Sequence, residues 1–253
     1  MMNNRMFRTK FNEVVKPILA DAGFLKSSSR GARRYKDSTI DVIEFQTFDS
    51  HIRDGVGCTP LSFSVRLGVH YRAIEKAPWL NKDEVKKSND NPREFDCEIR
   101  GALLKDVDQS GLFRPWGEKS TKDRMDVWYV CEDGSNLEDM LFRASSMVKK
   151  FGLQWFDYFN NTSNLLNDSE GIQFDRIENT LQGEGSFAAA ELYSSIALDL
   201  GLQDIAIEQW KKVIQNPYYN KPQSENWLKM AQKRIGIIQE LNAEKSPYRK
   251  RGI

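Results

Sequence analysis

The stretch LSFSVRLGVHY, residues 61–71, decides the fold class. From Leu61 to Tyr71 every second side chain is apolar, and the side chains between are small or polar. A period of two residues is that of a β-strand with one face turned to the core. Such half-buried strands are typical of antiparallel sheets. The stretch therefore predicts one strand of an antiparallel sheet.

Three further stretches predict the strands around it. Residues 40–48 are expected to be its hairpin partner, because the connection at 49–60 is rich in Gly and Asp. Residues 95–103 and 126–132 also alternate, and in both the cysteine falls on the apolar parity. We therefore expect Cys97 and Cys131 to be buried.

Helical periodicity precedes and follows these strands. Apolar residues recur at spacings of three and four over 7–22, and Gly23 supplies a helix end. Pro17 lies inside this pattern and lacks a backbone donor, so we expect a kink or a restart there. A second helix is predicted from Leu137, closed by Gly152. The fold class is therefore α+β, an N-terminal helix plus an antiparallel sheet with a packed helix, followed by an all-helical C-terminal part.

A polar, asparagine-rich stretch at 160–168 is the preferred domain boundary. It separates a predicted α+β sheet domain, 1–160, from a predicted helical region, 161–253, that ends in a short basic tail. Within that region 188–217 resembles one tetratricopeptide repeat unit, with a turn at Gly201 and with Ala206 and Trp210 in the seam between two helices.

A single unit of this kind must stack on something to bury its apolar face. The candidates are a helix at 227–241 and the segment 172–181, which we also expect to be helical. Two interpretations of the region stay open: a groove that grips a peptide from a partner, and a helical cap that stabilises the neighbouring domain.

Composition narrows the function classes. Lys and Arg number 37 against 36 Asp and Glu, a formal net charge of +1, which argues against a dedicated nucleic-acid or membrane-surface protein. Three cysteines are too few for a disulfide framework, and no window is apolar enough to span a bilayer. We therefore expect a cytoplasmic protein with no membrane partner.

The sequence predicts no catalytic residue, no metal site and no cofactor. The only histidines are His51 and His70, and neither a GxSxG elbow nor a glycine-rich nucleotide loop occurs. The histidines and cysteines also lack the close-paired spacing of structural zinc sites.

Two alternatives from other classes remain. A metal-dependent enzyme on nucleic acid would use four strand carboxylates, Asp41, Glu44, Asp96 and Glu98. A single-stranded nucleic-acid binder would use the densest basic cluster, Lys26, Arg30, Arg33, Arg34 and Lys36. A polar loop between helix and strand is the favoured explanation of that cluster.

Three stretches together resemble a known bacterial group. FNEVVKPILADAGFLK (11–26), SFSVRLGVHY (62–71) and DCEIRGALL (96–104) are similar to the domain of unknown function 4304 family, over most of residues 7–155. Glu98 stands where members of that family often have a histidine, so no histidine-based role is carried over. The resemblance implies a cytoplasmic α+β domain and supplies no activity, substrate or catalytic residue.

The leading hypothesis is a non-enzymatic protein–protein binding module, set by analogy alone in a bacterial conflict or defence system. Its predicted binding surface is the polar parity of the central strands together with one tryptophan. The predicted site residues are Arg66, His70, Glu98, Arg100 and Trp128. The alternative is that this face is covered and that its arginines and Glu98 form an internal ion-pair network.

Overall fold

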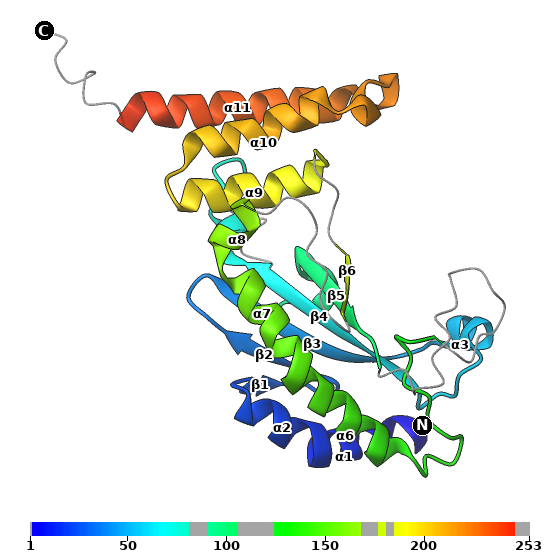
Figure 1. Ribbon diagram of the computed structural model, residues 1–253. Helices are drawn as coiled ribbons and strands as arrows, with labels where there is room; N and C mark the ends of the chain where they lie inside the picture. The colour runs from blue at the N-terminus through cyan, green and yellow to red at the C-terminus, as the bar shows by residue number, and fades with distance from the viewer. Residues whose placement is uncertain (1, 81–90, 106–123, 168–176, 181–184, 246–253) are drawn as a thin grey trace, which may run out of the picture. The chain divides into compact units, whose positions relative to one another are not determined.

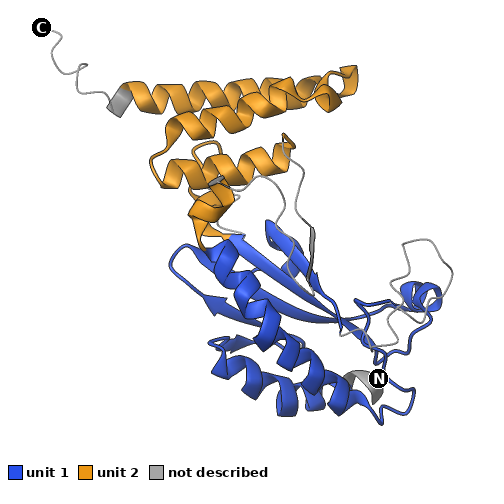
Figure 2. Cartoon of the chain, viewed as in Figure 1, with its two compact units in different colours: residues 1–70, 91–160, 172–180 blue, residues 71–90, 161–171, 181–253 orange. Residues whose placement is uncertain are grey.

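The computed structural model describes residues 2–80, 91–105, 124–167, 177–180 and 185–245. They form an antiparallel sheet with packed helices, followed by a helical C-terminal part, so the predicted α+β class is confirmed. The chain divides into two compact units (Figure 2). The sheet unit comprises 1–70, 91–160 and 172–180, and the helical unit comprises 71–90, 161–171 and 181–253. That 1–160 and 161–253 fold as separate domains stays a prediction.

Within the described residues the strands form one six-stranded sheet whose spatial order follows the chain (Figure 1). The pairs β1–β2, β2–β3, β4–β5 and β5–β6 are antiparallel. The strands are β1 (Lys26–Ser27), β2 (Gly31–Tyr35), β3 (Thr39–Thr47), β4 (Phe63–Tyr71), β5 (Ile99–Leu103) and β6 (Ile177–Thr180).

The two longest strands confirm the sequence predictions for 40–48 and 61–71, since β3 and β4 are neighbours in the sheet. The connection between them also holds a short helix, α3 (Ser50–Val56), which was predicted as loop. The side chain of Asp49 accepts the amide of Ile52 at 3.0 Å and so caps this helix.

Other predictions of local structure were wrong. The strand predicted at 95–103 begins only at Ile99, because Glu94–Asp96 forms the one-turn helix η2. Residues 126–132 contribute a single bridge, from Trp128 to Phe63, and Cys131 is exposed whereas Cys97 is buried. Ile177–Thr180 pairs with β5 as a strand, not as part of a helix.

One face of the sheet, the helix face, is covered by two helical runs (Figure 1). The first consists of α1 (Met2–Lys10), the wider turn η1 (Phe11–Val15) and α2 (Lys16–Asp21). Pro17 explains the restart, because it cannot donate to a carbonyl one turn back and η1 changes the hydrogen-bond pattern just before it. The second run consists of α6 (Leu137–Met147), η4 (Val148–Gly152) and α7 (Leu153–Asn160). Gly152 continues this run, contrary to the prediction that it ends the helix.

Aromatic rings join the helices to the helix face. Phe7 of α1 packs edge-on against Phe63 of β4 at 5.6 Å, and Phe11 packs edge-on against Phe45 of β3 at 5.3 Å between ring centroids. All four rings are buried. Edge-to-face pairs of this kind stabilise a fold beyond the area that they bury.

The opposite face is covered by residues 91–97, which we call the strap. Arg33 of β2 donates to the carbonyl oxygen of Pro92 at 2.6 Å, and Cys97 packs with Ile40 and Val42 of β3. We call this side of the sheet the strap face. The strap approaches it most closely at Gly68 of β4. A Cβ there would lie 2.6 Å from the sulfur of Cys97. The strap therefore needs glycine at this position.

The helical unit is built around α9 (Phe187–Asp199), which has buried side chains on every side and so is a central helix. It packs against α10 (Gln203–Gln215), α4 (Arg72–Glu75) and α8 (Thr162–Asn167). The short turns η5 (Pro217–Tyr219) and η6 (Pro222–Ser224) lead into α11 (Glu225–Lys245), which packs on α10. Ala206 and Trp210 lie in the buried core of the unit, as predicted. The predicted basic tail beyond Lys245 and residues 172–176 lie outside the described residues.

We predict opposite effects for alanine at two glycines of the sheet unit. Gly68→Ala forces the new Cβ against Cys97 and lowers the free energy of unfolding by about 1–3 kcal/mol. Gly55→Ala, in α3 where no atom lies within 4 Å of the new Cβ, raises it by about 0.5–1 kcal/mol. Urea denaturation of both variants measures the two effects, and a neutral Gly68→Ala contradicts the close approach of the strap.

Candidate functional site

The strap face brings together the two arginines of the predicted binding surface. Side chains opposite each other on paired strands share a face, and the register pairs Gly68 with Arg100 and Arg66 with Ala102. Arg66 forms a 3.4 Å ion pair with Asp126, and 29% of its side chain is exposed. Arg100 is 41% exposed. Both arginines are thus partly accessible and partly engaged.

Arg100 makes a two-point contact with the strap on this face. Its Nε and Nη2 donate to the two carboxylate oxygens of Glu94 in the strap at 2.8 and 3.0 Å. Glu94 is buried, and Gln46 of β3 donates to it at 3.5 Å. A bidentate pair fixes both partners geometrically. The pair raises the pKa of Arg100 above its ordinary value, chiefly through the hydrogen bonds to Glu94.

The other predicted site residues are not exposed beside these arginines. His70 is buried, and its Nδ1 lies 3.1 Å from Oε1 of Glu98. Trp128 is buried on the helix face, where its indole stacks at 6.1 Å on Phe63. The structure therefore places Arg66, Arg100, His70 and Glu98 on the strap face, and it places Trp128 on the opposite side of the sheet.

Asp41 is separated by the sheet from the other three carboxylates of the nuclease-like alternative. Asp41 faces the helices, whereas Glu44 is opposite Gly31 on the strap face, and Asp96 accepts the amide of Arg93 at 2.9 Å within its own turn. Among the described residues no group of three or more His, Cys, Asp and Glu side chains could hold a metal ion.

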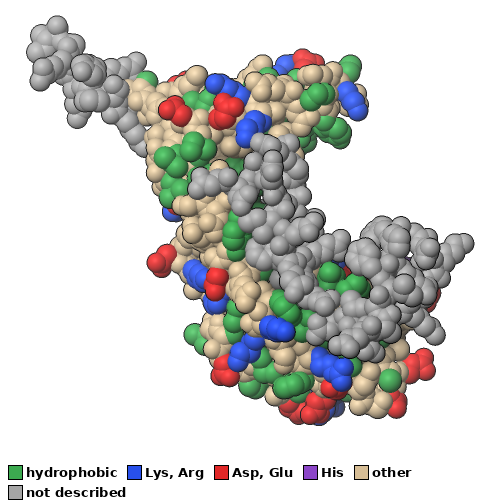
Figure 3. Space-filling view, in the orientation of Figure 1, with side chains coloured by type: hydrophobic (Ala, Val, Ile, Leu, Met, Phe, Trp, Pro, Cys, Tyr) green, Lys and Arg blue, Asp and Glu red, His purple; other side chains and the backbone are tan. Residues whose placement is uncertain are grey.

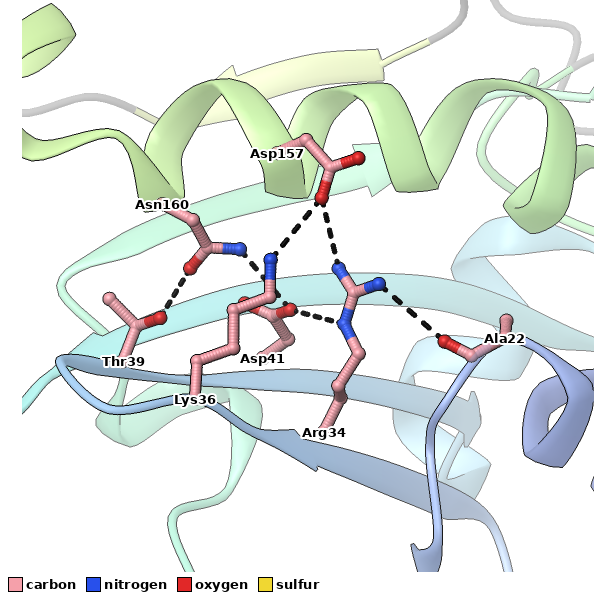
Figure 4. A network of polar contacts seen from close by, with 7 residues as sticks. All are labelled: Ala22, Arg34, Lys36, Thr39, Asp41, Asp157 and Asn160. Atoms are coloured by element: carbon pink, nitrogen blue, oxygen red, sulfur yellow. Dashed lines mark hydrogen bonds and ion pairs between the residues drawn. The ribbon is translucent and has the colours of Figure 1, made fainter.

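Asp41 is the centre of a polar network between the sheet and α7 (Figure 4). Its Oδ2 accepts from Nε of Arg34 at 2.7 Å and from the amide of Asn160 at 3.3 Å. The amide oxygen of Asn160 accepts in turn from the hydroxyl of Thr39. Asp157 of α7 pairs with Arg34 at 3.5 Å. The network therefore joins β2 and β3 to the last turn of α7.

Burial and ion pairing act in opposite directions on Asp41. The side chain is fully buried, and its Oδ1 has no hydrogen-bond partner within the described ranges. Burial is the larger effect and raises the pKa of Asp41 above 3.8, while Arg34 lowers it.

The basic cluster at 26–36 is divided between the two faces of the sheet. Arg33 donates to the strap, whereas Arg34 lies against Asp41 and the rings of Phe24 and Phe156 on the helix face. Lys36 pairs with Asp157 at 3.2 Å. Since two of its arginines point to opposite faces, the cluster does not form one continuous track for a phosphate backbone.

The helical unit exposes large apolar side chains at the end where α11 begins. Tyr218 is 66% exposed, Trp227 is 45% exposed and Met230 is 41% exposed. Trp227 and Met230 are one turn apart on α11, and η5, which holds Tyr218, packs on that helix. We call these three residues the aromatic corner. Figure 3 shows hydrophobic side chains with Lys or Arg beside them at this end of the unit.

Buried aromatic residues support the corner from behind. Phe187 packs on Trp227 at 4.7 Å, and its amide donates to the hydroxyl of Tyr219 at 2.9 Å. Arg234 of α11 places its guanidinium 4.5–5.3 Å from three ring centroids and pairs with Glu191 at 3.1 Å. The three rings are those of Trp79, Phe187 and Trp210. Trp227 of the corner therefore rests on a buried aromatic cluster.

A second exposed apolar group lies at the other end of α9 and α10, in the turn that joins them. Leu200 is 47% exposed and Leu202 is 41% exposed. The exposed side chains of this turn are aliphatic, whereas two of the three in the corner are aromatic. Because Leu200 and Leu202 are about as exposed as Trp227, substitutions in the turn can serve as controls for substitutions in the corner.

Sequence reasoning missed the aromatic corner. Trp227 stands at helical spacing with Leu228, Ala231 and Ile238, and this spacing predicts burial for all four. A signal was present nonetheless in Pro217 and Pro222, because proline is tolerated at the first turn of a helix and marks where one begins. Residues beside such a start lie at the end of a helical layer.

Comparison with known proteins gives one match. A family model described as "Domain of unknown function (DUF4304)" matches residues 15–158. No curated protein and no solved structure matches the chain significantly. In the part of the chain that the structure describes, no helix is long and apolar enough to cross a membrane.

We predict a distinct pH dependence for Asp41. A carboxyl group with a raised pKa keeps its proton to a higher pH in the folded state than in the unfolded state. Its contribution to the free energy of unfolding therefore falls as the pH rises from 3.8 through the folded-state pKa. The stability of the wild type relative to Asp41→Asn should fall over the same interval in urea titrations.

A relative stability that rises with pH would contradict this prediction. If the relative stability rises with pH instead, the Arg34 ion pair outweighs burial at Asp41, and the direction of the pKa shift is wrong. Other titrating groups cancel in this comparison, because they are common to both proteins.

We predict that Arg234 is required for the stability of the helical unit. Arg234→Ala leaves Glu191 without its cation and removes three ring contacts, at a cost of about 3 kcal/mol. Arg234→Lys restores the charge but not the planar stacking, so most of the loss should remain. Lys229→Ala removes an exposed pair with Glu225 on the same helix and should cost about 0.5 kcal/mol or less. Equal effects of Arg234→Ala and Lys229→Ala in thermal unfolding contradict this role.

Proposed function

This chain belongs to the DUF4304 family, and since that family is described by no activity, we propose a function from its own residues: a non-enzymatic protein–protein binding module. The observation that carries the proposal is the aromatic corner. Tyr and Trp are enriched among the residues that contribute most to protein–protein binding. Exposed side chains of this size, held by a buried aromatic cluster, can be covered by a partner without first being ordered.

We extend the proposal to the architecture of the helical unit. We interpret the hairpin of α9 and α10 as one tetratricopeptide-like unit, with Gly201 in the turn at a φ of 77°. In this interpretation α11 is the helix on which the unit stacks. The peptide-groove and cap interpretations are then compatible, because α11 closes the core and also presents the corner.

The strap face is the second proposed surface, as predicted from Arg66 and Arg100. Its support is the partial exposure of both guanidinium groups, and Arg is common at interfaces. The engagement of Arg100 by Glu94 weighs against it, because a partner would have to compete with a bidentate contact. A cytoplasmic location and a bacterial conflict or defence setting remain part of the proposal, the setting by analogy alone.

The experiment is an affinity capture from lysate of the source cell with the whole chain as bait. Trp227→Ala should weaken binding of the captured protein by about 2 kcal/mol, roughly 30-fold in affinity. Tyr218→Ala, the most exposed member of the corner, should act in the same direction with little effect on folding. The matched control is Leu202→Ala, of nearly equal exposure at the opposite end of the hairpin, and it should retain the captured protein.

A parallel bait, Arg66→Ala/Arg100→Ala, separates the two surfaces. Loss of the captured protein only with this double variant moves the site to the strap face. Capture that survives every one of these variants, or capture of nucleic acid alone, contradicts the proposed function at both surfaces.

A further inference from the structure

We propose that the aromatic corner takes an acidic peptide segment that carries apolar anchor residues. This inference rests on the proposed function and names the chemistry of the partner at the same site. Charge is distributed unevenly over the helical unit, although the net charge of the whole chain is only +1.

Positive charge is concentrated around the corner. Residues 211–233 contain five lysines and one acidic residue, so this segment has a formal charge of +4, whereas the whole chain has +1. The lysines are Lys211, Lys212, Lys221, Lys229 and Lys233. The single acidic residue, Glu225, is paired with Lys229 at 2.7 Å. That pair engages Lys229 as well as Glu225, so the positive charge left for a partner's carboxylates comes from the other lysines of the segment.

The lysines are placed to flank the apolar side chains. The ammonium group of Lys221 lies 5.2 Å from the ring centroid of Tyr218, so the charge and the ring share one surface. Two exposed lysines of α11 flank Met230 in the sequence. Lys229 directly precedes it, and Lys233 follows it by three residues. A segment that inserts apolar side chains between Tyr218 and Met230 would therefore bring its flanking residues next to these ammonium groups.

The opposite end of the hairpin has the opposite charge. Residues 199–208 contain Asp199, Asp204 and Glu208 and no basic residue, a formal charge of −3. Electrostatic complementarity mainly determines partner choice and rate of encounter. The polarity of the unit thus directs an acidic partner to the corner and away from the turn at Leu200.

A second copy of the chain, using its own acidic turn, is a less fitting occupant. Asp199 of that turn is already paired with Lys76 at 2.8 Å. A contact between two different ends of the same unit is also heterologous, and it propagates into open assemblies unless a ring closes. We therefore assign the corner to a separate acidic segment.

The test uses a random peptide library displayed on phage, selected on the whole wild-type chain after removal of phage that bind Trp227→Ala. Selected peptides should combine aromatic or aliphatic residues with a net negative charge. Synthetic copies should bind the wild type about tenfold more tightly than Lys221→Glu/Lys233→Glu, and affinity should fall as salt is raised. Tyr218→Ala, at a more exposed position, repeats the test without relying on one variant.

Each other outcome overturns a defined part of the account. Selected peptides that are neutral or basic, or that ignore the charge reversal, overturn the acidic partner and leave the binding module. Failure to obtain any peptide that distinguishes the wild type from both Trp227→Ala and Tyr218→Ala overturns the corner as a docking site and the proposed function with it. Self-association in sedimentation that is lost in Trp227→Ala makes a second copy the occupant and overturns the inference.

Discussion

The burial of β4 on both faces is the constraint on which the sheet unit depends. Eight of its nine residues are buried, although their alternation is that of a strand with one wet face. Polar groups buried with the strand must find partners, as His70 does in Glu98. The helices cover one face through aromatic contacts, and the strap crosses the other at Gly68. Two contacts hold the strap on the sheet. Arg100 donates to Glu94 of the strap, and Arg33 donates to the carbonyl oxygen of Pro92.

Because β4 is buried on both faces, the main proposed binding surface lies on the helical unit and not on the sheet. The polar side chains of the strap face largely satisfy one another, and the polar network of Asp41 joins the sheet to α7 on the helix face. In the helical unit the buried aromatic cluster around Arg234 leaves Tyr218, Trp227 and Met230 outside. These exposed side chains thus lie beside a buried aromatic cluster, and we propose that the surrounding lysines give them a preference among partners.

The sequence predicted the features that depend on local pattern. β4 was predicted because its alternation is specific to strands, and β3 was predicted as its neighbour across a connection rich in Gly and Asp. The restart at Pro17 follows from its missing donor. Features set by distant contacts were not predicted: β6 exists because β5 offers it an edge, and residues 126–132 are held by Phe63 across the chain. The predicted site failed partly for the same reason, because parity alone could not show that His70 is buried against Glu98 or that Trp128 stacks on the opposite face. Exposure of Trp227 likewise depends on where the helical layer ends.

The most direct test of the central claim is amide hydrogen exchange of the whole chain, measured with and without a peptide selected on the wild type. The claim is that partners dock on the helical unit at the aromatic corner and not on the covered sheet. It predicts added protection within 217–233 and unchanged exchange in the strap and β5. Protection confined to 92–103 would contradict it, because the partner would then bind on the face that the strap already covers.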